Sequence, residues 1–79
     1  MSIIKHITVM GATGSIGQST LALVRQFPEA FSIHALVAGS DVEGLAALAK
    51  EFRPKIIGLG DEKKIDHLHK ALGSIKIDI

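Results

Sequence analysis

Residues 9–21 read VMGATGSIGQSTL, in which an apolar run ends at a glycine and a segment with helical spacing follows. Three glycines, Gly11, Gly14 and Gly17, are spaced three apart. In a strand–turn–helix unit such glycines permit a tight turn, a close approach of a phosphate to the backbone, and close packing of the helix on the sheet. The stretch therefore predicts a turn whose helix amides bind a pyrophosphate.

The rest of the chain repeats this alternation of apolar runs and helical spacing. Strands are predicted at 3–10, 31–38 and 55–59, helices at 15–26, 42–52 and 62–72, and a fourth short strand at IKIDI, residues 75–79. The pattern indicates βαβ units and a parallel sheet. We expect an α/β, Rossmann-like half-domain of three-layer α/β/α type, with three to four parallel strands and about three helices. Because the complete fold joins two such halves, residues 1–79 are expected to be the N-terminal part of a nucleotide-binding domain.

Helix 15–26 has an apolar stripe that we expect to face the sheet. The stripe repeats at three and four residues and consists of Ile16, Thr20, Leu23 and Phe27, with Leu21 and Val24 beside it. The side chain of Ile16 is therefore predicted to be in the core, while its backbone N–H remains a candidate phosphate donor.

Thr13 and Ser15 are the polar side chains of the glycine turn. Their hydroxyl groups are candidate phosphate donors. Serine and threonine also cap helices without any ligand, and capping remains an alternative for both residues.

The second predicted strand ends in Gly39, Ser40 and Asp41, where this fold meets the adenosine ribose. An acidic residue there binds the 2′-hydroxyl of NAD, whereas the 2′-phosphate of NADP requires donors or a positive charge. Asp41 is thus either the ribose acid or the cap of the next helix. NADP binding would require Asp41 to turn away while Gly39 and Ser40 offer N–H and hydroxyl donors.

The composition argues against several other partners. Nine Lys or Arg against eight Asp or Glu give a net charge of +1, too little to attract nucleic acid or an acidic membrane. Cysteine is absent and no apolar stretch is long enough to span a bilayer, so a soluble cytoplasmic protein is expected. The four histidines have no ligand-like spacing, and no metal site is predicted in this segment.

Two stretches, GATGSIGQSTL at 11–21 and ALVAGSDV at 35–42, together resemble the N-terminal domain of the deoxyxylulose-phosphate reductoisomerase family. The resemblance implies an NADPH-dependent enzyme that rearranges and reduces 1-deoxy-D-xylulose 5-phosphate to 2-C-methyl-D-erythritol 4-phosphate, in non-mevalonate isoprenoid biosynthesis. It also implies a homodimer and a divalent metal, Mg or Mn, bound outside this segment. The 79 residues alone are expected to be inactive.

The same resemblance implies roles for individual residues. Thr13, Gly14, Ser15 and Ile16 match family positions that hold the phosphates of the cofactor. Gly39, Ser40 and Asp41 match the positions that hold the 2′-phosphate. The departure is Asp41, which is acidic where the family commonly has a neutral amide.

Two alternatives remain at this stage. The first is the cofactor half-domain of another NAD(P)-dependent enzyme, either a semialdehyde dehydrogenase or an extended short-chain dehydrogenase. The second is a non-catalytic half-Rossmann module that associates with itself through the bare edge of its first strand.

Overall fold

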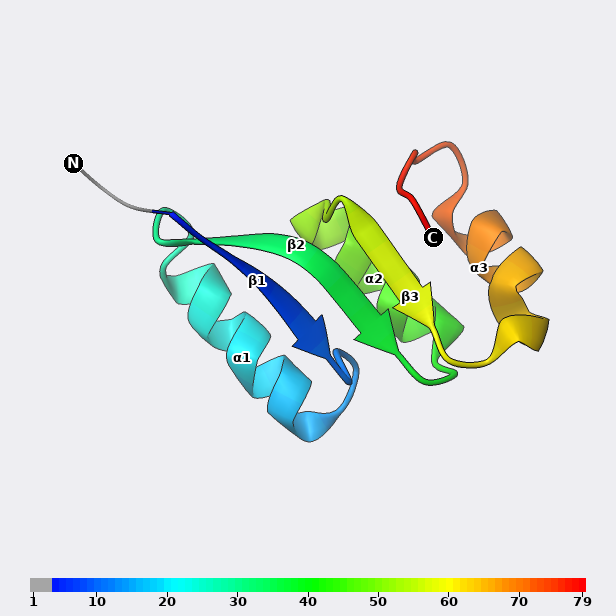
Figure 1. Ribbon diagram of the computed structural model, residues 1–79, viewed down its shortest axis with the longest axis horizontal. Coiled ribbons are helices and arrows are strands. Elements are labelled where there is room, and N and C mark those ends of the chain that lie inside the picture. Colours follow the sequence, from blue (N-terminus) through cyan, green and yellow to red (C-terminus); the bar gives the residue numbers. More distant parts are fainter. Residues whose placement is uncertain (1–3) are drawn as a thin grey trace.

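The computed structural model describes residues 4–79, which form one α/β unit (Figure 1). In chain order the elements are β1 (Lys5–Met10), α1 (Ser15–Gln26), β2 (Phe31–Ala38), α2 (Val42–Phe52), β3 (Ile56–Leu59), the short 3₁₀ helix η1 (Glu62–Lys64) and α3 (Ile65–Leu72). The predicted bounds of α1, β2 and α2 are confirmed. Part of the first predicted strand, residue 3, lies outside the described residues.

The three strands are parallel and lie in the order β1-β2-β3. The register of β1 against β2 shifts after Ile7, which pairs with Ile33, because Thr8 pairs with Ala35 and leaves His34 as the extra residue of a bulge. Since the strands are parallel, their carboxyl ends meet at one edge of the sheet. The loops after β1, β2 and β3 therefore lie side by side at that edge.

The predicted fourth strand is reduced to a single bridge. Asp78 pairs with Ile56 in a parallel sense, and the amide of Ile57 donates to the carbonyl of Asp78 over 2.8 Å. The sheet thus has three strands with the C-terminal segment beside β3, within the predicted three to four. The third predicted helix begins as η1 and continues as α3.

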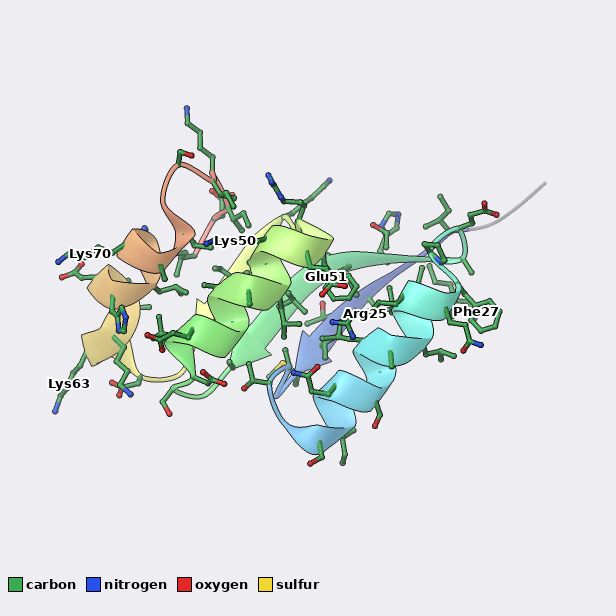
Figure 2. All side chains as sticks on the ribbon, turned by 180° about the vertical axis from the view of Figure 1, so that it is seen from behind. Arg25, Phe27, Lys50, Glu51, Lys63 and Lys70 are labelled. Atoms are coloured by element: carbon green, nitrogen blue, oxygen red, sulfur yellow. The ribbon has the colours of Figure 1, made fainter. Side chains whose placement is uncertain are left out.

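Helices α1 and α2 cover the same face of the sheet, as Figure 2 shows from the side of the helices. The Cα atoms extend over 43 × 26 × 14 Å, and the shortest dimension accommodates one helical layer on a sheet. The largest fully buried side chains lie between these layers and are Leu21, Leu36, Leu45, Ile57, Leu68 and Val42. The described residues therefore form two layers of the α/β/α arrangement and contribute no helix to the second face of the sheet.

The predicted core face of α1 is wrong for its central stripe, whereas Leu21 and Val24, predicted beside that stripe, are buried. Gly17, Leu21 and Val24 are the buried residues of this helix. Ile16 is 85% exposed and Leu23 is 48% exposed, so the predicted stripe, which also includes the half-exposed Phe27, lies on the outside. The physical reason is that Gly17 lies on the side of α1 that packs most closely against the turn. Because glycine has no side chain, the spacing of apolar residues does not reveal this side.

Arg25 of α1 and Glu51 of α2 link the two helices (Figure 2). The guanidinium donates two hydrogen bonds to the carboxylate, from Nε to Oε2 over 2.5 Å and from Nη2 to Oε1 over 2.7 Å. It also lies 5.1 Å from the centre of the Phe52 ring, a cation–π distance. The pKa of Glu51 is lowered, mainly because its carboxylate accepts these hydrogen bonds, while burial opposes the effect and the charge of Arg25 adds to it.

This pair predicts a pH-dependent contribution to stability. A carboxyl whose pKa is lowered by folding stabilises the folded state above its unfolded pKa, about 4.3, and this stabilisation is lost as the pH falls through the folded value. Because both side chains are partly exposed, we expect Glu51→Gln to cost about 0.5–1 kcal/mol at pH 7. Urea unfolding at pH 7 and at pH 3 should show a smaller difference from the unsubstituted chain at pH 3. A difference that is the same at both pH values would contradict the assignment.

Candidate functional site

The turn between β1 and α1 is shaped by its glycines. Gly11 has a φ of 62°, in the left-handed region that favours glycine, and its carbonyl accepts a hydrogen bond of 2.9 Å from the amide of Gly14. At Gly17 a β-carbon would lie 2.3 Å from the Gly11 carbonyl oxygen and 2.7 Å from the Cα of Ala12. Since these neighbours are backbone atoms, only glycine permits α1 to start this close to the strand.

The first turn of α1 has amides that the described chain does not use. The helix begins after Gly14, which has no side chain to cap it, and the first helical hydrogen bond runs from the amide of Gln18 to the carbonyl of Gly14 over 2.9 Å. The N–H groups of Ser15, Ile16 and Gly17 precede that bond and have no acceptor among residues 4–79. Together with the positive end of the helix dipole they form an arrangement that binds anions.

Capping does not explain the polar residues of the turn. The capping position is held by Gly14, and no side chain accepts from the free amides of α1. Ser15 is itself the first helical residue, exposed to solvent, and Thr13 is partly exposed. Neither hydroxyl group therefore caps α1, and both residues adjoin the free amides along the chain. The exposed Ile16 side chain, predicted to be buried, projects from the same turn.

At the end of β2, Asp41 caps the following helix, which was one of the two interpretations of this residue. Its carboxylate accepts a hydrogen bond of 3.0 Å from the amide of Gly44 and caps α2. A β-carbon at Gly44 would lie 2.3 Å from Oδ2 of Asp41 and 2.9 Å from Cγ2 of Thr13, so these side chains would have to shift for a larger residue. Thr13 of the glycine turn therefore lies close to the first turn of α2.

Replacing Asp41 separates its role as a cap from its charge. Asp41→Ala is expected to cost about 0.5–2 kcal/mol of unfolding free energy, because the amide of Gly44 loses its acceptor. Asp41→Asn keeps an oxygen acceptor and is expected to stay within about 0.5 kcal/mol of the unsubstituted chain. Urea unfolding of both variants measures this. Equal losses for the two would show that the carboxylate stabilises α2 by its charge alone.

Backbone hydrogen bonds join the three loops at the carboxyl edge. The amide of Ala12 donates to Val37, that of Gly60 to Ala38, and that of Asp61 to Gly39, each over 2.9 Å. The carboxylate of Asp61 accepts from the amide of Lys63 over 3.1 Å and caps η1. The loop after β3 is thereby fixed next to Gly39 and Ser40. Sequence reasoning did not include this loop in the site.

Lys64, the last residue of η1, reaches the end of β2. Its ammonium Nζ lies 3.4 Å from the carbonyl oxygen of Ser40. The two residues are 24 positions apart, so local sequence patterns contain no signal for the contact.

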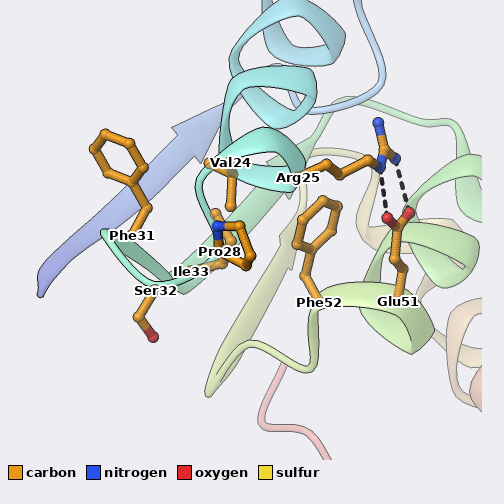
Figure 3. Close-up of a pocket in the computed structure, with 8 residues that line it drawn as sticks. All are labelled: Val24, Arg25, Pro28, Phe31, Ser32, Ile33, Glu51 and Phe52. Carbon is orange, nitrogen blue, oxygen red and sulfur yellow. Dashed lines mark hydrogen bonds and ion pairs between the residues drawn. The ribbon is translucent and has the colours of Figure 1, made fainter.

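A cavity of about 360 Å³ lies at the other end of the sheet, away from these loops (Figure 3). It is between the C-terminal ends of α1 and α2 and the beginning of β2. Its lining consists of Val24, Arg25, Pro28, Phe31, Ser32, Ile33, Glu51 and Phe52. None of the predicted site residues contributes to it.

The histidines of the described residues do not group with other potential metal ligands. Among residues 4–79, no group of three potential ligands that could hold a metal ion is found. His67 of α3 contacts Glu43 of α2, with Nε2 3.1 Å from Oε1, on the exposed side of the two helices. None of the helices in residues 4–79 has the length and apolarity needed to cross a membrane.

The β1-α1-β2-α2-β3 order, the parallel sheet and the glycine turn define the chain as a Rossmann-like α/β unit. The family model of 1-deoxy-D-xylulose 5-phosphate reductoisomerase matches residues 7–79. The chain belongs to this family, which decides against the two dehydrogenase families considered from the sequence.

Individual relatives agree with the family match. The chain is 45% identical over 74 residues to the 1-deoxy-D-xylulose 5-phosphate reductoisomerase of Bradyrhizobium sp. strain BTAi1, covering 94% of this chain and 18% of the relative. It is 43% identical over 75 residues to the reductoisomerase of Desulfitobacterium hafniense strain Y51, covering 95% of this chain and 20% of the relative. The chain thus spans about a fifth of the length of these relatives.

Solved structures of the family superpose on the chain. The Zymomonas mobilis reductoisomerase in complex with NADPH has a TM-score of 0.90 at 36% identity, covering 99% of this chain and 21% of that one. A reductoisomerase in complex with magnesium has a TM-score of 0.92 at 38% identity, covering 98% of this chain and 20% of that one. The backbone described above is therefore shared with these members of the family over about a fifth of their length.

Proposed function

We propose that this chain is the NADPH-binding segment of a 1-deoxy-D-xylulose 5-phosphate reductoisomerase. The complete enzyme would convert 1-deoxy-D-xylulose 5-phosphate to 2-C-methyl-D-erythritol 4-phosphate in isoprenoid biosynthesis. The observation that carries the proposal is the first turn of α1, where three amides have no acceptor in the described chain, in a segment whose family includes a structure with NADPH. When bound, NADPH supplies the hydride for the reduction.

The residues of the turn fit a pyrophosphate. The free amides of Ser15, Ile16 and Gly17 would donate to its oxygens, and the hydroxyl groups of Thr13 and Ser15 are further candidate donors. At Gly14 a β-carbon would lie 3.3 Å from the Gly11 carbonyl oxygen, so a larger residue would crowd the turn as well as a ligand. Gly11 and Gly17 belong to the proposed site because they shape this turn, and Gly17 also offers its amide to the cofactor.

The residues after β2 fit the adenosine ribose. Gly39 has no atom within 4 Å of the position of a β-carbon, so the backbone there is open to a ligand. The Asp41 carboxylate is turned towards Gly44 of its own helix. This orientation supports NADPH over NADH, because Gly39 and Ser40 then face the 2′-phosphate with Asp41 directed away from it.

Several features of the complete protein belong to this proposal through its family. They are a divalent metal bound by residues outside this segment, a homodimer, a cytoplasmic location, and the assignment of residues 1–79 to the N-terminal part of the NADPH-binding domain. The position of β1 at the edge of the sheet supports self-association of the separate chain, since an unpaired strand edge recruits partners. Light scattering at rising concentration tests the self-association, and a constant monomer mass would contradict it.

Binding of the cofactor is the direct test of the proposed function. Titration of the chain with NADPH and with NADH, followed by nucleotide fluorescence, is expected to give saturable binding with preference for NADPH. Addition of 1-deoxy-D-xylulose 5-phosphate and Mg²⁺ to the 79-residue chain is expected to oxidise no NADPH at 340 nm. Failure of both nucleotides to bind would contradict the proposal.

A further inference from the structure

The ammonium of Lys64 is held at the segment that the proposed function assigns to the 2′-phosphate. Its Nζ lies 3.4 Å from the Ser40 carbonyl oxygen. The loop that presents it is fixed by the hydrogen bond from the amide of Asp61 to the carbonyl of Gly39. Lys64 is therefore held at this end of β2 by its own side chain and by the backbone of Asp61, to which its amide is hydrogen-bonded.

A phosphate at Gly39 and Ser40 would need a cation, because the nearest ionised group along the chain is the carboxylate of Asp41. The alternatives are occupied or directed elsewhere. Figure 2 shows the Lys63 side chain extending away from the molecule, and His67 contacts Glu43. Within the described part of the chain, Lys64 forms no ion pair with a carboxylate. A lysine ammonium has three N–H donors, and the Ser40 carbonyl accepts from one, which leaves two for a ligand.

We propose that Lys64 binds the 2′-phosphate of NADPH and so determines the preference for NADPH over NADH. This inference rests on the proposed function and adds a residue of η1 to a site otherwise formed by the loops after β1 and β2. The ammonium neutralises the phosphate where Ser40, itself uncharged, contributes only a hydroxyl and backbone donors. The charge of Asp41 is offset at the same time, which accounts for an acidic residue at the end of β2 in a segment proposed to bind NADPH.

The test compares Lys64→Met with the matched variant Lys63→Met, which removes the same charge from the adjacent residue of η1. NADPH and NADH are titrated separately into each chain. Lys64→Met is expected to weaken NADPH binding about ten-fold, the effect of losing one charge-assisted hydrogen bond, and to change NADH binding by less than about two-fold. Lys63→Met should leave both affinities within about two-fold, and Lys64→Arg should retain the preference for NADPH.

The outcomes separate this inference from the proposed function. If the unsubstituted chain binds neither nucleotide, the proposed function fails. If it binds NADPH and Lys64→Met weakens NADPH and NADH equally, Lys64 only holds the loop and the inference is overturned. An unchanged preference in Lys64→Met, or an equal loss in Lys63→Met, overturns it as well, while NADPH binding by the segment stands.

Discussion

Replacing Gly17 with alanine is expected to lower the free energy of unfolding by about 2–3 kcal/mol, which is a large effect for the addition of one methyl group. The added β-carbon would lie 2.3 Å from the Gly11 carbonyl oxygen and 2.8 Å from the carbonyl carbon of Ala12. These are backbone atoms of the turn, so the clash is relieved only if α1 moves away from the end of β1. The same movement would displace the free amides, and NADPH binding is expected to weaken in parallel.

The matched control is Gly39→Ala. A β-carbon at Gly39 would have no atom within 4 Å, and its φ is not in the left-handed region. Its unfolding free energy is therefore expected to stay within about 0.5 kcal/mol of the unsubstituted chain. Urea unfolding followed by circular dichroism measures both variants. A Gly17→Ala chain as stable as Gly39→Ala would show that the close approach of α1 is not required.

Leu21→Ala is expected to cost about 2–5 kcal/mol, whereas Leu23→Ala, two residues along the same helix, should stay within about 1 kcal/mol. Leu21 is completely buried between α1 and the sheet, and about half of Leu23 is exposed. For a chain of this size the total stability is on the order of 4–12 kcal/mol, so the first substitution removes a large part of it.

The two leucine variants also test which side of α1 faces the sheet. The helical stripe read from the sequence would make Leu23 a costly position as well as Leu21 beside it, whereas in the structure only Leu21 of these two is buried. Thermal unfolding of both chains in one buffer provides the comparison. A larger loss of stability in Leu23→Ala than in Leu21→Ala would contradict the structure of this helix.

Local signals were sufficient for most of the fold. Glycine and proline mark the ends of helices and strands in the sequence, as in the turn 11–17, at Pro28 after α1 and at Gly39 after β2. The predicted bounds of α1, β2 and α2 are confirmed. The orientation of α1 about its own axis was not predictable in this way. It depends on the contact of Gly17 with the backbone of Gly11, and a residue without a side chain is invisible to a hydrophobic pattern.

The candidate site was partly predictable for the same reason. The glycine turn and the segment 39–41 are contiguous motifs, so their residues were identified from the sequence. The role of Asp41 remained open because capping and ribose binding require the same residue type. The hydrogen bond from the amide of Gly44 depends on the orientation of the Asp41 side chain, which the sequence does not show. The contacts of Lys64 with Ser40 and of Arg25 with Glu51 join residues 24 and 26 positions apart, for which a single sequence contains no signal.

The central claim is that the free amides at the start of α1 bind the phosphates of NADPH. The most direct measurement is the ¹H–¹⁵N NMR spectrum of the chain during addition of NADPH. The account predicts that the amide signals of Ser15, Ile16 and Gly17 move most, and that those of Phe31 and Ser32 at the opposite end of β2 remain in place. Shifts confined to other residues, with the signals of this turn unchanged at saturating NADPH, would contradict it.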